Sequence, residues 1–264
     1  MPIFKKCKDP ALKALKDTGF NVVQLPRPDL LPTQLLVAKS GRLRRLGELT
    51  SVFIQNENSA PIPKIRPEQP GPNISGTRSQ DVKIGIGIDI LSGLISALGG
   101  GTLGINAAYS KASSIQFTYG DTTRVDCDFV DIDAYIASCD INPHSRAIRD
   151  MLDADDVYVV TSVIKSKKID VKAKSKDGTE FKVDVPTIEN TIGGNVALTT
   201  AGDSSSVISY EGSLSLSFGF QALRLKFDGD TYETAKIVKA GDVIAESTSA
   251  PDYLDTEQML EADF

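Results

Sequence analysis

Apolar and polar residues alternate strictly over residues 82–90, where valine or isoleucine occupies every second position. A period of two gives a β-strand one apolar face. Residues 91–98 then follow the i, i+3, i+4, i+7 spacing of a short amphipathic helix, and glycines at 99–101 end it. Alternation returns over residues 103–109 and 115–119. The pattern predicts two long strands separated by a short helix, each strand apolar on one side only.

Two structures fit these strands. An antiparallel pair with one face on a core is the ordinary cause of alternation, and periodicity alone favours it. Strands of roughly ten residues are also long enough to cross a bilayer in a tilted β-barrel with a polar lumen. The positions of this stretch that would enter the membrane in the second structure are Val82, Ile84, Ile86, Ile88, Ile90, Leu103, Ile105, Tyr109, Ile115 and Phe117.

Three later segments also have the composition of strands. Residues 157–164 form a nearly continuous apolar run, which predicts a central strand. Residues 168–174 and 181–185 alternate on either side of an Asp-Gly turn, which predicts a hairpin whose polar lysines are solvated or meet acidic lipid headgroups. Residues 213–220 alternate small polar with large apolar side chains. These segments add Ile169, Val171, Phe181, Val183, Leu214, Leu216 and Phe218 to the candidate membrane-inserting positions.

The rest of the chain predicts a mixture of helices and strands. Prolines at 61, 63, 67, 70 and 72 forbid regular structure over residues 57–80, which we interpret as a long connector inside the domain. The other predicted elements are helices over 9–19, 131–139 and 142–152 and strands over 20–25, 34–38, 49–54 and 236–245.

Charge is unevenly distributed along the 264 residues, whose formal net charge is −6. The first sixteen residues are rich in lysine, whereas residues 251–264 carry only acidic charges. Residues 246–250 form a linker of the kind that proteases enter easily. A fraying terminus rarely keeps many large apolar side chains, so we expect the tail to dock on the body. The side chains expected to make that contact are Tyr253, Leu254, Met259, Leu260 and Phe264.

The cysteines and the absence of an export pattern predict the compartment. Cys7, Cys127 and Cys139 are odd in number and widely spaced, which argues against a disulfide framework and for a reducing compartment. The first residues do not have a signal-peptide pattern, and the sequence contains no run of 18 apolar residues. We therefore expect a chain made as a soluble cytosolic protein.

Catalytic chemistry has little support. The single histidine, His144, precedes a predicted helix, where a capping or surface role is the ordinary one. The cysteines have no metal-ligand spacing, and the glycine-rich segments lack the Lys-Ser/Thr of a phosphate loop. Basic residues are not interleaved with aromatics, which argues against a nucleic-acid partner. We expect no enzymatic activity, no metal site and no dissociable cofactor.

Three features together resemble a bacterial gasdermin: Cys7-Lys8-Asp9-Pro10 before a short helix, two amphipathic β-segments split by other material, and a short apolar-acidic tail. The resemblance implies an α+β fold with a twisted, mostly antiparallel central sheet, flanking helices and a docked C-terminal peptide. It implies a pore-forming domain over residues 1–245 and an autoinhibitory peptide over 246–264. A cysteine near the N-terminus carries palmitate in such proteins, which makes Cys7 the candidate for lipidation. A plain thiol is the alternative for Cys7.

The resemblance also implies a mechanism. The chain would be an inactive cytoplasmic monomer until a caspase-like protease removes the C-terminal peptide. The N-terminal part would then oligomerise with membrane lipids into a β-barrel pore in the inner membrane, killing the cell as an antiphage defence. The cut would fall within Ala245, Glu246, Ser247, Thr248, Ser249 and Ala250.

A different class of protein also fits the residues. In a cytosolic structural or binding domain without membrane activity, every alternating strand would be ordinary core and the tail would be a stabilising strap. Loss of the tail separates the two classes, because it would create a toxic activity in the first and only reduce stability in the second.

Overall fold

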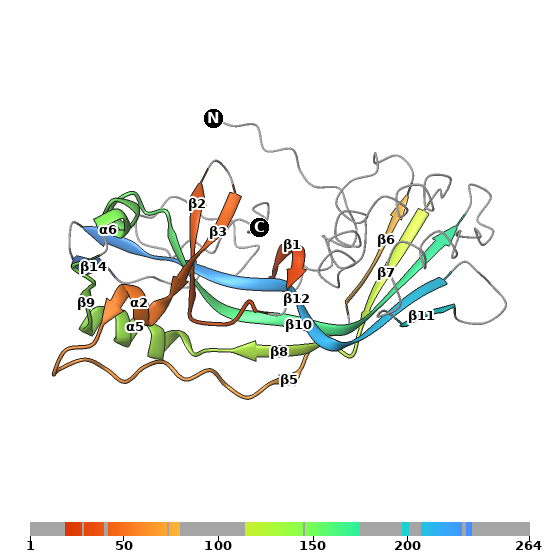
Figure 1. The fold of residues 1–264 in the computed structure, drawn as a ribbon, viewed down its shortest axis with the longest axis horizontal. Coiled ribbons are helices and arrows are strands. Elements are labelled where there is room, and N and C mark those ends of the chain that lie inside the picture. The colour runs from red at the N-terminus through yellow and green to blue at the C-terminus, as the bar shows by residue number, and fades with distance from the viewer. Residues whose placement is uncertain are drawn as a thin grey trace, which may run out of the picture.

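The computed structural model describes residues 19–27, 29–39, 42–72, 74–79, 114–144, 146–174, 197–200, 207–228 and 231–233. Within them, ten strands form one antiparallel sheet and three helices lie near one of its ends (Figure 1). The predicted α+β class with a mostly antiparallel sheet is confirmed. The docked C-terminal peptide lies outside the described residues, as do the predicted helix over 9–19 and the strand over 236–245.

Two long strands run the length of the sheet (Figure 1). β10 (Val157–Lys174) and β12 (Val207–Arg224) are each 18 residues long and pair antiparallel with each other. The apolar run at 157–164 forms the first part of β10, and the alternating segment at 213–220 lies within β12. Both segments are strands as predicted.

Short strands flank this central pair toward the helical end. The sheet order is β1-β12-β10-β2-β3, with β1 (Asn21–Arg27), β2 (Gln34–Lys39) and β3 (Arg42–Glu48). The remaining members of the sheet are β5 (Gln69–Pro70), β6 (Ile74–Ser79), β7 (Ser114–Gly120), β8 (Thr123–Asp126) and β11 (Ala197–Thr200).

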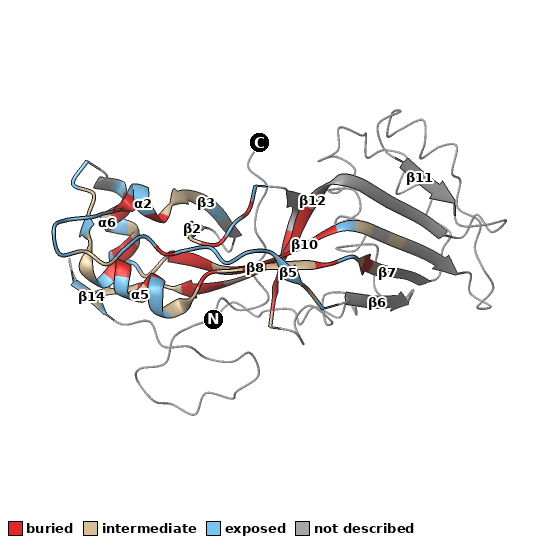
Figure 2. Ribbon diagram, turned by 90° about the horizontal axis from the view of Figure 1, so that it is seen from below, coloured by how far each residue is buried: buried red, intermediate tan, exposed pale blue. Residues whose placement is uncertain are grey.

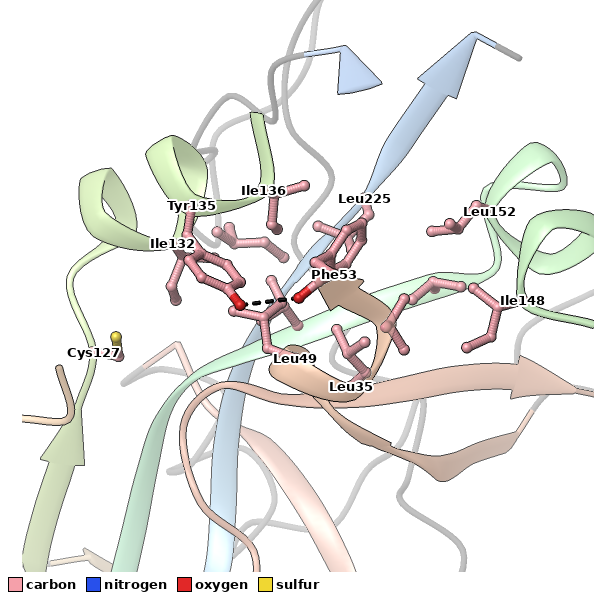
Figure 3. Packing of buried hydrophobic residues seen from close by; sticks show 14 residues of the cluster. Leu35, Leu49, Phe53, Cys127, Ile132, Tyr135, Ile136, Ile148, Leu152 and Leu225 are labelled. Carbon is pink, nitrogen blue, oxygen red and sulfur yellow. Dashed lines mark hydrogen bonds between the residues drawn. The ribbon is translucent and has the colours of Figure 1, made fainter. Parts of the chain in front are cut away.

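The helical end holds the larger of the two apolar clusters found among the described residues. Leu35 of β2, Leu49 and residues of the helices pack around Phe53, and the Tyr135 hydroxyl donates a hydrogen bond of 2.9 Å to the Phe53 carbonyl (Figure 3).

Burial raises the pKa of Tyr135 to about 12 and that of Cys127 to about 11, so both stay protonated at neutral pH. The elements of this end are α2 (Leu49–Val52), α5 (Phe129–Ser138), α6 (Arg146–Asp153), β4 (Phe53–Ile54), β9 (Asp140–Ile141), β13 (Lys226–Asp228) and β14 (Thr231–Glu233).

The second apolar cluster lies along the central strands. Val163 of β10 and Phe220 of β12 are directly opposite each other, both are fully buried, and Leu30 and Val23 pack in the same cluster. Buried residues follow β10 and β12 from the helical end into the middle of the molecule (Figure 2). We call the part of the sheet that these two clusters pack against the rigid half.

The proline-rich connector runs beside β8 (Figure 1). The backbone N–H of Arg66 donates to the Asp126 carbonyl and that of Gly71 to the Thr122 carbonyl, each at 2.7 Å. Arg66 also forms an ion pair with Asp128. An extended chain rich in proline covers a sheet edge without offering a full ladder of donors to another strand.

Two predictions are partly wrong. Residues 57–80 were expected to lack regular structure, but they contain β5 and β6, and β6 follows the last proline of the segment and pairs with β7 along its whole length. Residues 49–54 were expected to form a strand, but Leu49–Val52 form the short helix α2 and only Phe53–Ile54 are extended. Leu49 and Val52 are both buried and lie three residues apart, a spacing that a helix turn can place on one side. A six-residue segment with apolar residues at positions 49, 52, 53 and 54 does not distinguish the helical period from the strand period.

Candidate functional site

The end of the sheet away from the helices consists of strands β6, β7, β10, β12 and β11, in that order (Figure 1). We call these strands the outer sheet. Every pair in it is antiparallel. The pairing of β10 with β2 and β8 ends before this region, and from Lys168 to Lys174 β10 pairs with β7.

The register of the outer sheet sorts residues by polarity. The first apolar row joins Ile74, Tyr119, Ile169, Tyr210 and Leu198, and the second joins Gly76, Phe117, Val171, Ile208 and Thr200. The row between them joins Ser75, Thr118, Asp170, Ser209 and Thr199.

Alternation along the strands places these rows on opposite faces. Directly opposite residues of an antiparallel pair share a face, and successive residues of one strand alternate between faces. The next row on the polar side joins Thr77, Gln116, Lys172 and Val207, of which only Val207 is apolar. The outer sheet therefore has one predominantly apolar face and one polar face.

A bulge separates the outer sheet from the rigid half. Ser166 is opposite Leu216, but Lys168 is opposite Glu211, so a single residue of β10 stands against residues 212–215 of β12. The Ser166 Oγ lies 2.7 Å from the Gly120 carbonyl oxygen and 2.6 Å from that of Lys168, and it accepts a bond from the Lys168 N–H at 3.0 Å. Bulges bend strands and increase their twist, and both long strands turn here (Figure 1).

An aromatic stack lies close to the bulge. The rings of Tyr119 and Phe218 have centroids 4.0 Å apart and planes 2° apart, and both residues are buried. Tyr119 is also a member of the first apolar row. The stack therefore connects the apolar face of the outer sheet with the packed part of β12.

The register brings together part of the predicted membrane-inserting set. Ile115, Phe117, Ile169 and Val171 fall on neighbouring strands of the outer sheet. Leu216 and Phe218 are buried nearer the rigid half, and Leu214 lies in the bulged stretch of β12. Outside the described residues are Val82, Ile84, Ile86, Ile88, Ile90, Leu103, Ile105, Tyr109, Phe181 and Val183, together with Cys7, the cleavage segment and the tail contacts.

The selection from sequence missed five apolar members of these two rows: Ile74, Tyr119, Leu198, Ile208 and Tyr210. Tyr119 continues the alternation of Ile115 and Phe117, and Ile208 and Tyr210 flank Ser209 with the same period, so a signal was present for these three. Ile74 stands in the segment Ile-Ser-Gly-Thr-Arg-Ser, which has no apolar alternation. Only its pairing with Tyr119 of β7 identifies Ile74 as a member of the first apolar row.

Other kinds of site find no support in the described part of the chain. None of its helices has the length and apolar character needed to span a membrane. Its histidine, cysteine, aspartate and glutamate residues form no cluster of three or more that could hold a metal ion. His144 is exposed in the turn before α6, where its backbone N–H donates a hydrogen bond to the side-chain oxygen of Asn142.

Comparison with known proteins decides the family. The model of the Bacterial Gasdermin Family matches residues 23–236. This chain belongs to the bacterial gasdermin family. It is 47% identical over 268 residues to a gasdermin of Lysobacter enzymogenes, covering 98% of this chain and 99% of that protein. It is 37% identical to a gasdermin of a Desulfuromonadales bacterium, covering 89% and 88%.

The fold agrees with this assignment. A solved bacterial gasdermin from Bradyrhizobium tropiciagri superposes with a TM-score of 0.63 at 17% identity, covering 86% of this chain and 91% of that structure. The gasdermin fold predicted from the resemblance is confirmed. The chain is thus a gasdermin, a class of pore-forming protein, and its outer sheet is the candidate functional element.

Proposed function

We propose that this gasdermin is an autoinhibited pore former whose outer sheet enters a membrane after proteolysis removes residues 246–264. The observation that carries the proposal is the sorting of the outer sheet into apolar and polar rows across strands far apart in sequence. A membrane-spanning sheet needs one face for lipid and one for a water-filled lumen. The alternating rows supply both.

Insertion requires the strands to lengthen. β6 and β7 are 6 and 7 residues long, whereas a tilted transmembrane strand needs about 9–11 residues. The segment between β6 and β7 contains the alternating residues 82–90 and 103–109, and the segment between β10 and β12 contains 181–185. We propose that these residues extend the four strands into two membrane-spanning hairpins.

The C-terminal peptide is the proposed inhibitor. Each large apolar side chain that it buries against the body contributes about 1.5–3 kcal/mol, and Tyr253, Leu254, Met259, Leu260 and Phe264 are available for this. The covalent tether keeps the peptide at a high effective concentration. A caspase-like protease cutting between Ala245 and Ala250 would remove that advantage and let the peptide leave.

We also propose a cellular setting for this mechanism. The inactive chain is a cytoplasmic monomer, and the cut chain oligomerises in the inner membrane and permeabilises the cell as an antiphage defence. Palmitate on Cys7 would strengthen attachment, and the neighbouring Lys5, Lys6 and Lys8 would favour an anionic surface.

Dye release from vesicles of phosphatidylethanolamine, phosphatidylglycerol and cardiolipin tests the proposal. The chain carries an engineered protease site near residue 248, and we expect release only after cutting. The matched control is the chain without the site, treated with the same protease. A cut protein that stays folded and leaves the vesicles intact would contradict pore formation and favour the structural or binding domain.

A further inference from the structure

The last strand of the outer sheet differs from the others in length. β11 has 4 residues, whereas its partner β12 has 18. β11 pairs with β12 from Ile208 to Glu211, on the side of β12 opposite to β10 (Figure 1). It therefore covers part of the β12 edge with few backbone hydrogen bonds.

Strand directions set β11 apart from the other four. Every neighbouring pair in the outer sheet is antiparallel, so β6, β10 and β11 run one way and β7 and β12 run the other. In the unit β6-β7-β10-β12, the first and last strands run in opposite directions. When β11 is added, the first and last strands, β6 and β11, run in the same direction.

This difference decides how copies can join. Copies related by rotation in a ring keep their strands in the same orientation. If β11 stayed in place, it would meet the β6 strand of the next copy in a parallel pair and break the alternation. Without β11, β12 meets β6 antiparallel, and each copy adds an even number of strands, as in closed antiparallel transmembrane sheets.

The residues of β6 match the positions that β11 occupies. In the place of Leu198, Thr199 and Thr200, a β6 strand in the same direction would set Ile74, Ser75 and Gly76 beside Tyr210, Ser209 and Ile208. The apolar and polar rows would then continue from one copy to the next. Barrel closure needs a stagger between strands, and a stagger of two residues keeps the faces matched.

The position of β11 in sequence gives a second, independent reason. β11 ends at Thr200 and β12 begins at Val207. If β12 lengthens toward its N-terminus, residues 197–206 are drawn into the hairpin with β10 and cannot also pair beside β12. Lengthening and exposure of the β12 edge are therefore one event.

We propose that β11 is a removable cover on the β12 edge, and that the β6 strand of a second copy of this chain replaces it during assembly. The inference rests on the proposed pore formation. It adds the step that prevents premature joining, because a free strand edge is a template for association.

Two disulfides in the same row of the ladder test the cover. Thr199→Cys with Ser209→Cys links β11 to β12, and Thr118→Cys with Asp170→Cys links β7 to β10, which the inference keeps paired. In an antiparallel sheet, the N–H and C=O groups of one residue both point to the same neighbouring strand. Successive pairs along a row therefore alternate between hydrogen-bonded and non-hydrogen-bonded pairs. The two engineered pairs therefore share one type and have comparable Cα separations, within the range a disulfide spans.

Each variant is cut near residue 248 and added to dye-loaded vesicles with and without reductant. We expect the oxidised β11–β12 variant to lose at least about tenfold in release rate, since a ring with one blocked edge cannot close, and reductant to restore release. The oxidised β7–β10 variant should leak at its reduced rate.

Undiminished leakage from the oxidised β11–β12 variant would overturn the inference. Loss of leakage in both oxidised variants would also overturn it, because β7 and β10 would then have to separate. If the reduced, cut variants and the cut parent chain all release no dye, the proposed pore formation is wrong. That outcome differs from the two that overturn only the role of β11.

Discussion

Replacing Phe117 by lysine should lower dye release by the cut protein by about 30- to 700-fold, because a lysine on the lipid face of a transmembrane sheet costs about 2–4 kcal/mol and every 1.4 kcal/mol is tenfold. Phe117 belongs to the second apolar row, between Gly76 and Val171. Each copy in a ring would carry this cost. The measurement is the initial rate of release at equal concentrations of folded, cut protein.

The neighbouring residue provides the control. Thr118 is the next residue of β7, lies in the polar row and is opposite Asp170. Thr118→Lys adds the same charge to the same strand, so we expect release within about threefold of the parent, because lumen-facing changes tune a pore without blocking insertion. Before cutting, both variants should unfold near the urea midpoint of the parent. Equal leakage by the two variants would contradict the assignment of faces.

The second large effect concerns the rigid half of the sheet. Phe220→Ala should reduce the free energy of unfolding by about 3–5 kcal/mol, the range for removing a fully buried phenylalanine. Phe220 is 0% exposed and packs with Val163 and Leu30. Its backbone is opposite Asn21 on one side and Val163 on the other, so neighbouring strands limit the collapse of the cavity. Urea unfolding of the uncut chain measures the change.

A surface substitution of similar chemistry is the comparison. Val130 lies on α5 and is 71% exposed, so Val130→Ala should change the free energy of unfolding by less than about 0.5 kcal/mol. An unchanged slope of stability against urea for both variants would show that the same surface unfolds. A loss below about 1 kcal/mol for Phe220→Ala would contradict the assignment of this cluster as the stabilising core.

The strands that carry the function were largely predictable, because their signal is local. The alternation over residues 115–119 and 213–220 predicts strands with one apolar face, whichever strands they pair with. Both segments are strands, in β7 and β12. The resemblance that linked them with Cys7 and the tail led to the correct family. Lipidation of Cys7, the cleavage segment and docking of the tail remain predictions.

The pairing was not predictable, because it depends on contacts between distant residues. Nothing near Ile74 in sequence indicates that it shares a row with Tyr119, Ile169 and Tyr210. The bulge at Ser166 depends on the Gly120 carbonyl, which another strand supplies. Register of this kind is set by long-range packing and by bulges, and a single sequence contains no pattern that records it.

The most direct test of the central claim measures the environment of β7 residue by residue. A polarity-sensitive fluorophore is attached to single cysteines introduced at positions 115 to 119, in a chain whose three native cysteines have been replaced. After cutting and addition of vesicles, we expect blue-shifted emission and quenching by lipid-attached quenchers at positions 115, 117 and 119. Positions 116 and 118 should instead respond to a water-soluble quencher. Five positions that all remain in water, or that share one environment without alternation, would contradict the account.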